Sequence, residues 1–281
     1  MPELGGDTPL ETILGDARGI GFAGIELGGK FPRDPGVLGP LLDRYDLSLV
    51  GGWFSGNLLA HDVDAEIVAA ADHLALLKAM GSTIWVHAET SNAVHGRRST
   101  PLSQTPRLAD CAAFGRRMTD FADYLRGHGL RLAYHHHLGT VIEGPDDLGA
   151  FIRATGESVG LTIDTGHAAL GGIDPVATIR AHPGRIAHIH CKDVRPRVFS
   201  ALRERDGSFL DGVLAGMFTT PGDGSLDYAA VMRSLAEIGY SGWIVVEAEQ
   251  DPAIADPRQY GALGLATLRR EAVGARLREA V

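Results

Sequence analysis

The sequence of 281 residues predicts an α/β fold built on a parallel sheet, and a (β/α)8 barrel is the fold of this class that matches its length. Short segments rich in Val, Ile and Leu alternate with longer amphipathic ones, as in parallel strands covered by helices on both faces. No interdomain linker or internal repeat interrupts this alternation. Residues 1–281 are therefore expected to form one domain.

Seven apolar segments are expected to be strands of the sheet. A helix expected at residues 10–19 precedes the first of them. A closed barrel of this kind has eight strands, so the sequence leaves open whether the chain lacks the first strand of the barrel. The expected strands are residues 24–27, 47–53, 83–87, 131–136, 159–164, 186–191 and 243–247.

Helices are expected between these strands. An apolar stripe at helical spacing runs through residues 64–80. Asp174 and Pro175 suit the cap and the first position of another helix, and Ser225 is expected to cap a third. Residues 194–223 are the least regular and are expected to form a lid or rim beside a site. The remaining expected helices are residues 108–127, 145–155 and 257–280.

The composition is that of an ordinary globular protein, with 44% hydrophobic and 22% charged residues. No apolar run reaches the roughly 18 residues that a membrane span needs, and the N-terminus has no signal-peptide pattern. The net charge of −9 argues against a nucleic acid as the main ligand. Cys111 and Cys191 form no CxxC motif, so a reducing, cytoplasmic setting is expected.

Nearly every expected strand ends in a polar or ionisable residue, and the carboxyl ends of parallel strands form the functional face of such folds. Glu143, Asp164, His190 and Glu247 follow the last four strands and are predicted to bind a metal ion. Three carboxylates and one imidazole suit Mn²⁺, Mg²⁺ or Co²⁺. Each residue taken singly is better explained by a solvated or salt-bridged charge, and the four together favour the metal site.

Three consecutive histidines stand near one strand end, and neighbouring strand residues face opposite sides. Either His136 faces inward, or His135 and His137 do; His136 is the favoured one. His167 is expected to be a fifth metal ligand, to donate a proton, to bind substrate or to cap a helix. Lys192 is expected to act as a base, to stabilise an oxyanion or to pair with Asp193.

Other strand-end residues are candidates for substrate binding. Glu26, Trp53 and His87 end the first three strands. Arg195 is expected either to reach substrate oxygens or to be an exposed charge on the rim. The PGDG stretch at 221–224 resembles a phosphate-binding loop at the start of a helix. It lacks the glycine spacing of the GxGxxG and Walker motifs, so a tight turn is favoured.

These motifs resemble the xylose-isomerase-like (β/α)8 TIM barrel superfamily, in which DTGH, HxHxKD and a late VVE recur. The closer resemblance is to the inosose dehydratase family of myo-inositol catabolism. It is carried by GIELG at 24–28, YHHHLGT at 134–140, HIHCKDVR at 188–195, PGDG at 221–224 and GWIVVEAEQDP at 242–252. The resemblance implies Glu143, Asp164, His190 and Glu247 as ligands of Mn²⁺ or Co²⁺. It also implies glutathione for some members.

The reaction implied by the resemblance is loss of water from 2-keto-myo-inositol (scyllo-inosose) to give a trihydroxycyclohexane-1,2-dione. Glu143, Glu247 or Lys192 would remove the proton next to the ketone, and His136 or His167 would protonate the departing hydroxide. The alternatives are a ketose isomerase or epimerase with the same enediolate chemistry, a zinc-dependent DNA-repair endonuclease, and a non-catalytic sugar-binding protein. The partner is expected to be a small polyol or ketose. The sequence leaves open whether the chain is a monomer or a homo-oligomer.

Overall fold

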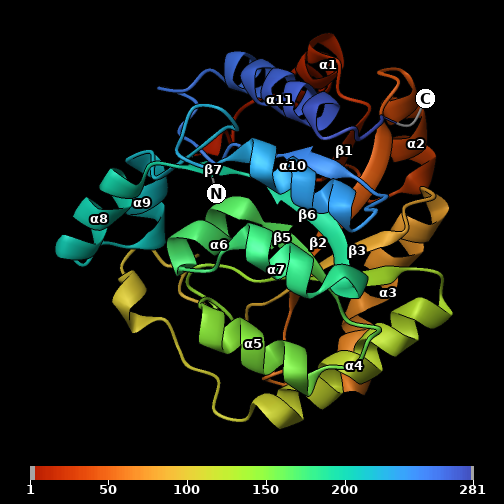
Figure 1. Cartoon of the computed structure of the whole chain (residues 1–281). Helices are drawn as coiled ribbons and strands as arrows, with labels where there is room; N and C mark the ends of the chain where they lie inside the picture. The colour runs from red at the N-terminus through yellow and green to blue at the C-terminus, as the bar shows by residue number, and fades with distance from the viewer. Residues whose placement is uncertain (1–3, 280–281) are drawn as a thin grey trace.

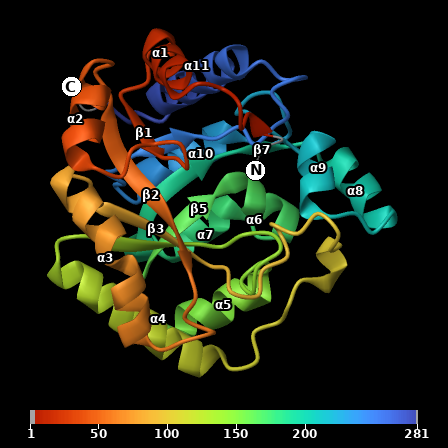
Figure 2. The ribbon, with the colours of Figure 1, turned by 180° about the vertical axis from the view of Figure 1, so that it is seen from behind.

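The computed structural model describes residues 4–279, in which parallel strands form one strongly curved sheet surrounded by helices (Figures 1 and 2). The sheet has seven strands, all at the predicted places, which confirms the barrel fold. β1 and β9 are its two edges, so an open seam lies between them. In sheet order the strands are β1 (Gly24–Leu27), β2 (Ser48–Gly56), β3 (Ile84–Glu89), β4 (Arg131–His135), β5 (Gly160–Asp164), β6 (Ile186–Cys191) and β9 (Ile244–Val246).

Helices connect successive strands and cover the outside of the sheet (Figure 1). The predicted cap Ser225 is wrong, because Asp227 accepts the hydrogen bond from the Ala230 amide and the helix starts at Tyr228. The short α6 was not predicted; Asp164 caps it. The helices are α1 (Leu10–Ile20), α2 (Pro35–Asp43), α3 (Val63–Ala79), α4 (Cys111–Gly127), α5 (Pro145–Ala154), α6 (Thr165–Gly171), α7 (Pro175–Ala181), α10 (Tyr228–Glu237) and α11 (Pro257–Gly274).

Residues 193–219 leave the barrel as a helical excursion, which Figures 1 and 2 show as a pair of helices standing out at one side. It begins with β7 (Asp193–Val194) and ends with β8 (Phe218–Thr219), which pair antiparallel, and it contains α8 (Pro196–Glu204) and α9 (Phe209–Leu214). The sequence predicted an irregular loop here. The excursion instead packs around an apolar core that it shares with two barrel residues, Leu138 and Leu170. Its own contributions to this core are Val194, Leu202, Phe209, Val213, Met217 and Phe218.

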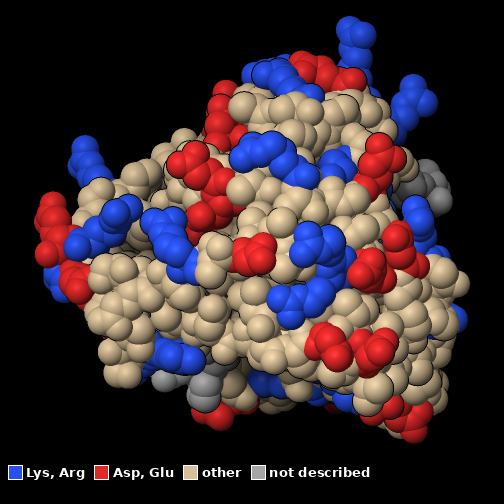
Figure 3. Space-filling view, turned by 90° about the horizontal axis from the view of Figure 1, so that it is seen from below, with Lys and Arg blue, Asp and Glu red and all other residues tan. Residues whose placement is uncertain are grey.

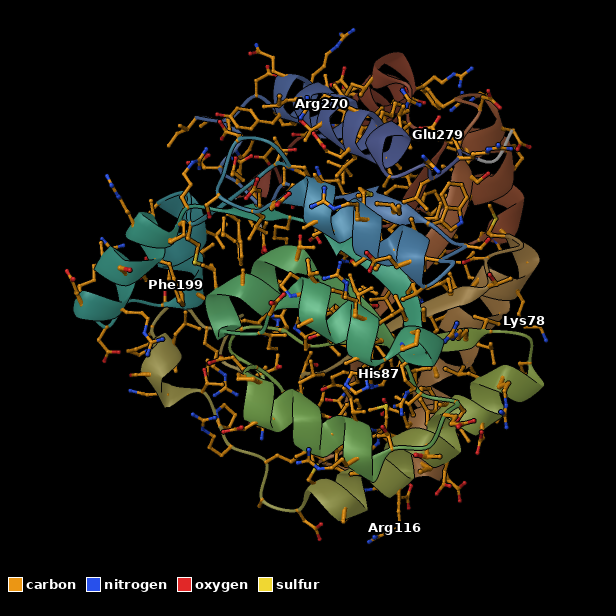
Figure 4. The ribbon with its side chains drawn as sticks, in the orientation of Figure 1. Lys78, His87, Arg116, Phe199, Arg270 and Glu279 are labelled. Atoms are coloured by element: carbon orange, nitrogen blue, oxygen red, sulfur yellow. The ribbon has the colours of Figure 1, made fainter. Side chains whose placement is uncertain are left out.

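Aromatic packing determines which side chains of β3 and β4 face the helices. The His87 ring lies 5.6 Å from that of Phe121 on α4, and the Tyr134 ring lies 4.2 Å from that of Phe151 on α5. Because side chains alternate along a strand, His135 faces the opposite side from Tyr134, into the barrel. His87 is fully buried among the side chains between strand and helix, as Figure 4 shows.

The surface carries both signs of charge. On the face shown in Figure 3, Lys and Arg side chains are interspersed with Asp and Glu. Within residues 4–279, no helix combines the length and the apolar character needed to cross a bilayer.

The packing of α4 on α5 can be tested with two glycines of α4. A Cβ on Gly115 would lie 2.4 Å from the carbonyl oxygen of Ala154, whereas one on Gly127 would meet no atom within 4 Å. Gly115→Ala should lower the free energy of unfolding by about 1–3 kcal/mol through overpacking. The control Gly127→Ala should leave it unchanged or raise it by up to about 1 kcal/mol. Urea denaturation measures both, and equal values would contradict the close approach of the two helices.

Candidate active site

Four side chains meet at the carboxyl ends of neighbouring strands. His135 ends β4, Asp164 ends β5, His190 lies near the end of β6 and Glu247 follows β9. One nitrogen or oxygen atom from each lies within 4.8 Å of the others. We call these residues the four-residue cluster. His135 Nε2 is 3.5 Å from Asp164 Oδ2, which is 3.8 Å from His190 Nδ1, and His190 Nδ1 is 3.0 Å from Glu247 Oε2.

The cluster fits a divalent metal ion. Asp164 Oδ2, His190 Nδ1 and Glu247 Oε2 are buried and make ion-pair contacts but no hydrogen bond of good geometry. Such atoms cost about 1–3 kcal/mol each, which a bound cation would relieve. Ligands about 2.1 Å from a tetrahedral ion lie about 3.4 Å from one another, close to the separations in the cluster.

Hydrogen bonds orient both imidazoles of the cluster. His135 Nδ1 lies 2.7 Å from the carbonyl oxygen of His136, so it donates there and leaves Nε2 free as an acceptor. His190 Nε2 lies 3.0 Å from Glu26 Oε1, which leaves Nδ1 facing the cluster. Burial lowers the pKa of His190, but Glu26 and Glu247 outweigh it and raise that pKa well above the usual value. A metal ion would therefore displace a proton from Nδ1.

The structure corrects the predicted place of Glu143 in the metal site. Its Oε2 accepts hydrogen bonds from the Gly139 amide at 2.7 Å and the Thr105 hydroxyl at 3.1 Å, and it is not among the clustered atoms. β4 already ends at His135, and the turn that follows carries Glu143 away from the strand ends. His135 takes the expected place of Glu143, which changes the donor set from three carboxylates and one imidazole to two of each.

His135 and His137, rather than His136, lie among the rings of the site. The His135 ring lies 5.2 Å from that of His190, and the His137 ring lies 3.7 Å from that of His167. Neither nitrogen of His136 has a partner, and burial lowers its pKa to about 3. The favoured inward position of His136 is therefore corrected, because the outward Tyr134 fixes the alternation.

Lys192 is a buried cation beside the cluster. Its Nζ lies 3.1 Å from both Glu247 Oε1 and Glu249 Oε2 and 3.5 Å from Asp164 Oδ2. Burial alone lowers the pKa of Lys192, but the three carboxylates outweigh it and hold that pKa above its usual value. The side chain is thus an ammonium, suited to stabilising negative charge or giving a proton. Among the roles left open by the sequence, the arrangement does not favour that of a base.

Aromatic rings form the outer wall of the site. Burial keeps the pKa of His167 well below its usual value, so its ring is neutral, and Nε2 lies 3.2 Å from Lys192 Nζ. Phe218 of the helical excursion lies 4.9 Å from this ring. The Trp53 ring lies 5.4 Å from that of His135, so Trp53 is the one expected substrate-binding residue with a ring contact to the cluster among the described residues.

The side chains of the other expected substrate-binding residues, Glu26, His87 and Arg195, are engaged with other protein groups. Glu26 Oε1 is shared by His188 Nε2 at 2.5 Å and His190 Nε2 at 3.0 Å. Burial raises the pKa of Glu26, but these imidazoles outweigh it and hold that pKa below its usual range. His87 is enclosed between β3 and α4, because β3 turns that face towards the helices. Arg195 bonds the carbonyl oxygen of Gly216 at 3.0 Å and pairs with Asp223, within the rim.

The PGDG stretch is a tight turn, as favoured, and its amides are occupied. The Asp193 carboxylate, fully buried, accepts hydrogen bonds from the backbone amides of Gly222, Gly224, Ser225 and Leu226 at 2.9–3.2 Å. This anchors the base of the helical excursion to the start of α10.

Sequence reasoning missed several residues of the wall. The Phe209 ring lies 5.1 Å from the His137 ring, and the His95 ring lies 4.7 Å from the His137 ring. His95 and Phe209 come from segments without strand periodicity, so no sequence signal pointed to them. For His135 and His137 a signal existed: an aromatic Tyr134 suits the face of β4 that packs on helices.

The sequence pattern of the xylose isomerase-like TIM barrel matches residues 14–270. A rhizopine catabolism protein, MocC, from Rhizobium meliloti is 48% identical over 99% of this chain and 86% of its own length. An inosose dehydratase from Geobacillus thermodenitrificans is 38% identical over 92% of this chain and 89% of its own length. The solved structure of an IolI protein with a binding zinc atom has a TM-score of 0.65 at 16% identity, over 97% and 95% of the two chains.

The corrected ligand set predicts different effects for two substitutions. His135→Ala should weaken Co²⁺ binding by more than about 100-fold, since losing a ligand costs more than losing a group that orients one. Glu143→Gln, outside the four-residue cluster, should leave the affinity within about threefold of the original. Competition with a chelator of known affinity measures both. Strong loss in Glu143→Gln with none in His135→Ala would restore Glu143 as the ligand.

Proposed function

The chain belongs to the xylose isomerase-like TIM barrel family, and we propose that it is a metal-dependent hydro-lyase, an inosose dehydratase. It would remove water from 2-keto-myo-inositol (scyllo-inosose) to give a trihydroxycyclohexane-1,2-dione. The observation that carries the proposal is the four-residue cluster with a buried ammonium, Lys192, beside it. Relatives 34–38% identical over nearly the whole chain are named inosose dehydratases, which supports this substrate.

His135, Asp164, His190 and Glu247 would hold the metal ion. When bound, the ion would withdraw electrons from a substrate ketone and so make the neighbouring C–H bond more acidic. Two imidazoles and two carboxylates suit Mn²⁺, Co²⁺ or Zn²⁺. We propose Mn²⁺ or Co²⁺, in line with the family resemblance; a glutathione requirement rests on that resemblance alone.

Side chains around the cluster can carry out the proton transfers. Glu249 would take the proton from the carbon next to the ketone, since burial raises the pKa of its carboxyl and makes it a better base. Lys192 would stabilise the negative charge that develops on the ketone oxygen. The carbon–oxygen bond to the next carbon then breaks, a double bond forms, and the ammonium of Lys192 protonates the leaving hydroxide to give water. Glu249 Oε2, 3.1 Å from Lys192 Nζ, would then return the proton taken from carbon to Lys192. The neutral His167 would bind the substrate.

The setting suits a small neutral polyol. Phe209 and Phe218 cover the His167 side of the site and would limit the access of water. We propose that the protein acts in the cytoplasm, on a small molecule rather than on a nucleic acid or a membrane.

A spectroscopic assay tests the function directly. Protein supplied with Mn²⁺ or Co²⁺ should convert scyllo-inosose to a product with the ultraviolet absorbance of an enolised dione, and EDTA should abolish the conversion. Dehydration that persists in EDTA would contradict the proposal. A ketose epimerase, the alternative, would instead yield an isomer of the substrate with no rise in absorbance. A rhizopine in the same assay tests the substrate suggested by the name of the 48% identical relative.

Glu249→Gln tests the assignment of the base. The amide cannot accept the proton, so kcat should fall by about 10²–10⁴-fold while the bound metal content stays unchanged. Glu237→Gln is the control, because Glu237 forms an exposed ion pair with Arg180 at 2.6 Å on the outside of the barrel. Its kcat should match that of the original protein. Full activity in Glu249→Gln would assign the base elsewhere.

A further inference from the structure

We propose that Glu26 is a positioning residue of the metal centre, which holds the His190 imidazole with Nδ1 towards the ion. The proposal rests on the metal site proposed above and adds a residue outside the ligand set. It also replaces the substrate-binding role that the sequence suggested for Glu26.

The bond between Glu26 and His190 crosses the seam of the barrel. Glu26 lies on β1, at one edge of the sheet, whereas His190 lies on β6, which pairs with the other edge strand, β9. Glu26 Oε1 and His190 Nε2 are nevertheless 3.0 Å apart. The side chains thus join β1 and β6, two strands that do not pair with each other.

A second imidazole fixes the carboxylate. His188 and His190 face the same side of β6, because they are two residues apart. His188 Nε2 lies 2.5 Å from the same Glu26 Oε1, and His188 is completely buried. Glu26 therefore cannot rotate away from His190 without breaking a second hydrogen bond. A surface carboxylate meeting a histidine by chance would have no such support.

The chemical consequence concerns which nitrogen of His190 is available. An imidazole that donates its Nε2 hydrogen to a carboxylate presents an unprotonated Nδ1, and the carboxylate increases the basicity of that nitrogen. Without Glu26 the ring can carry its hydrogen on Nδ1, towards Asp164 and Glu247, and can turn about its side-chain bonds. Groups that orient a metal-binding histidine in this way typically contribute 10–100-fold to metal affinity.

Glu26, His188 and His190 also offer three atoms within 4.8 Å of one another, which could suggest a second metal site. These atoms are already engaged in the hydrogen bonds just described, unlike the atoms of the four-residue cluster that make no hydrogen bond of good geometry. The proposal therefore predicts one ion per chain, and two ions would overturn it.

Cobalt binding tests the proposal without an activity assay. Protein stripped of metal is titrated with Co²⁺, followed by visible absorption, and the dissociation constant is obtained by chelator competition. Glu26→Gln should weaken binding by about 10-fold and Glu26→Ala by up to about 100-fold. The matched control is Glu66→Gln, which alters a buried carboxylate that is likewise bonded to a histidine, with Oε2 2.6 Å from His61 Nε2. It should lower the melting temperature and leave the cobalt affinity unchanged.

The outcomes separate the two proposals. If the original protein binds no Co²⁺, the proposed metal centre fails. If it binds one ion and Glu26→Gln behaves like Glu66→Gln, the centre stands and the positioning role of Glu26 is wrong. Nitrogen NMR of the zinc-loaded original protein adds a measurement that needs no variant. His190 should be bound through Nδ1 with a hydrogen on Nε2, and binding through Nε2 would overturn the proposal.

Discussion

The arrangement of the site depends on a buried ammonium among carboxylates. Lys192 lies within 3.5 Å of Asp164, Glu247 and Glu249, and buried charges are stable only when they are balanced. One ammonium and three carboxylates leave two negative charges, which a divalent cation would neutralise. The same contacts keep Lys192 protonated and draw the ends of β5, β6 and β9 together. Metal binding and strand packing therefore share one electrostatic constraint.

Asp164, His190 and Glu247 could be predicted from the sequence because each stands at or directly beyond the end of an apolar segment. The sequence did not show that His135, and not His136, faces the barrel interior. Strands buried on both faces show no polar alternation, so the sequence does not say which residue faces the barrel interior. The packing of Tyr134 against Phe151 decides it. The same ambiguity explains why His87 was wrongly expected to bind substrate: it stands near the end of a strand, but its side chain faces a helix.

The least predictable part is the helical excursion at residues 193–219. Its helices are short, and its apolar core forms only when residues from β7, β8 and distant loops come together. Local periodicity carries little of this information, so a loop was the natural expectation. Phe209 and Phe218 reach the rings of the site only through this non-local packing. The outer wall of the site is thus a property of the tertiary structure.

Asp193 bears on which substrates the fold can accept. Backbone amides at the start of a helix commonly recruit a phosphate group, and the PGDG turn has such amides. Here the carboxylate of Asp193 fills their anion-binding capacity permanently, from a fully buried position. A phosphorylated sugar would find these donors saturated and would bring added negative charge towards an acidic centre. The chain thus carries its own anion at this turn, and the amides that bind Asp193 are not free to bind a phosphate group.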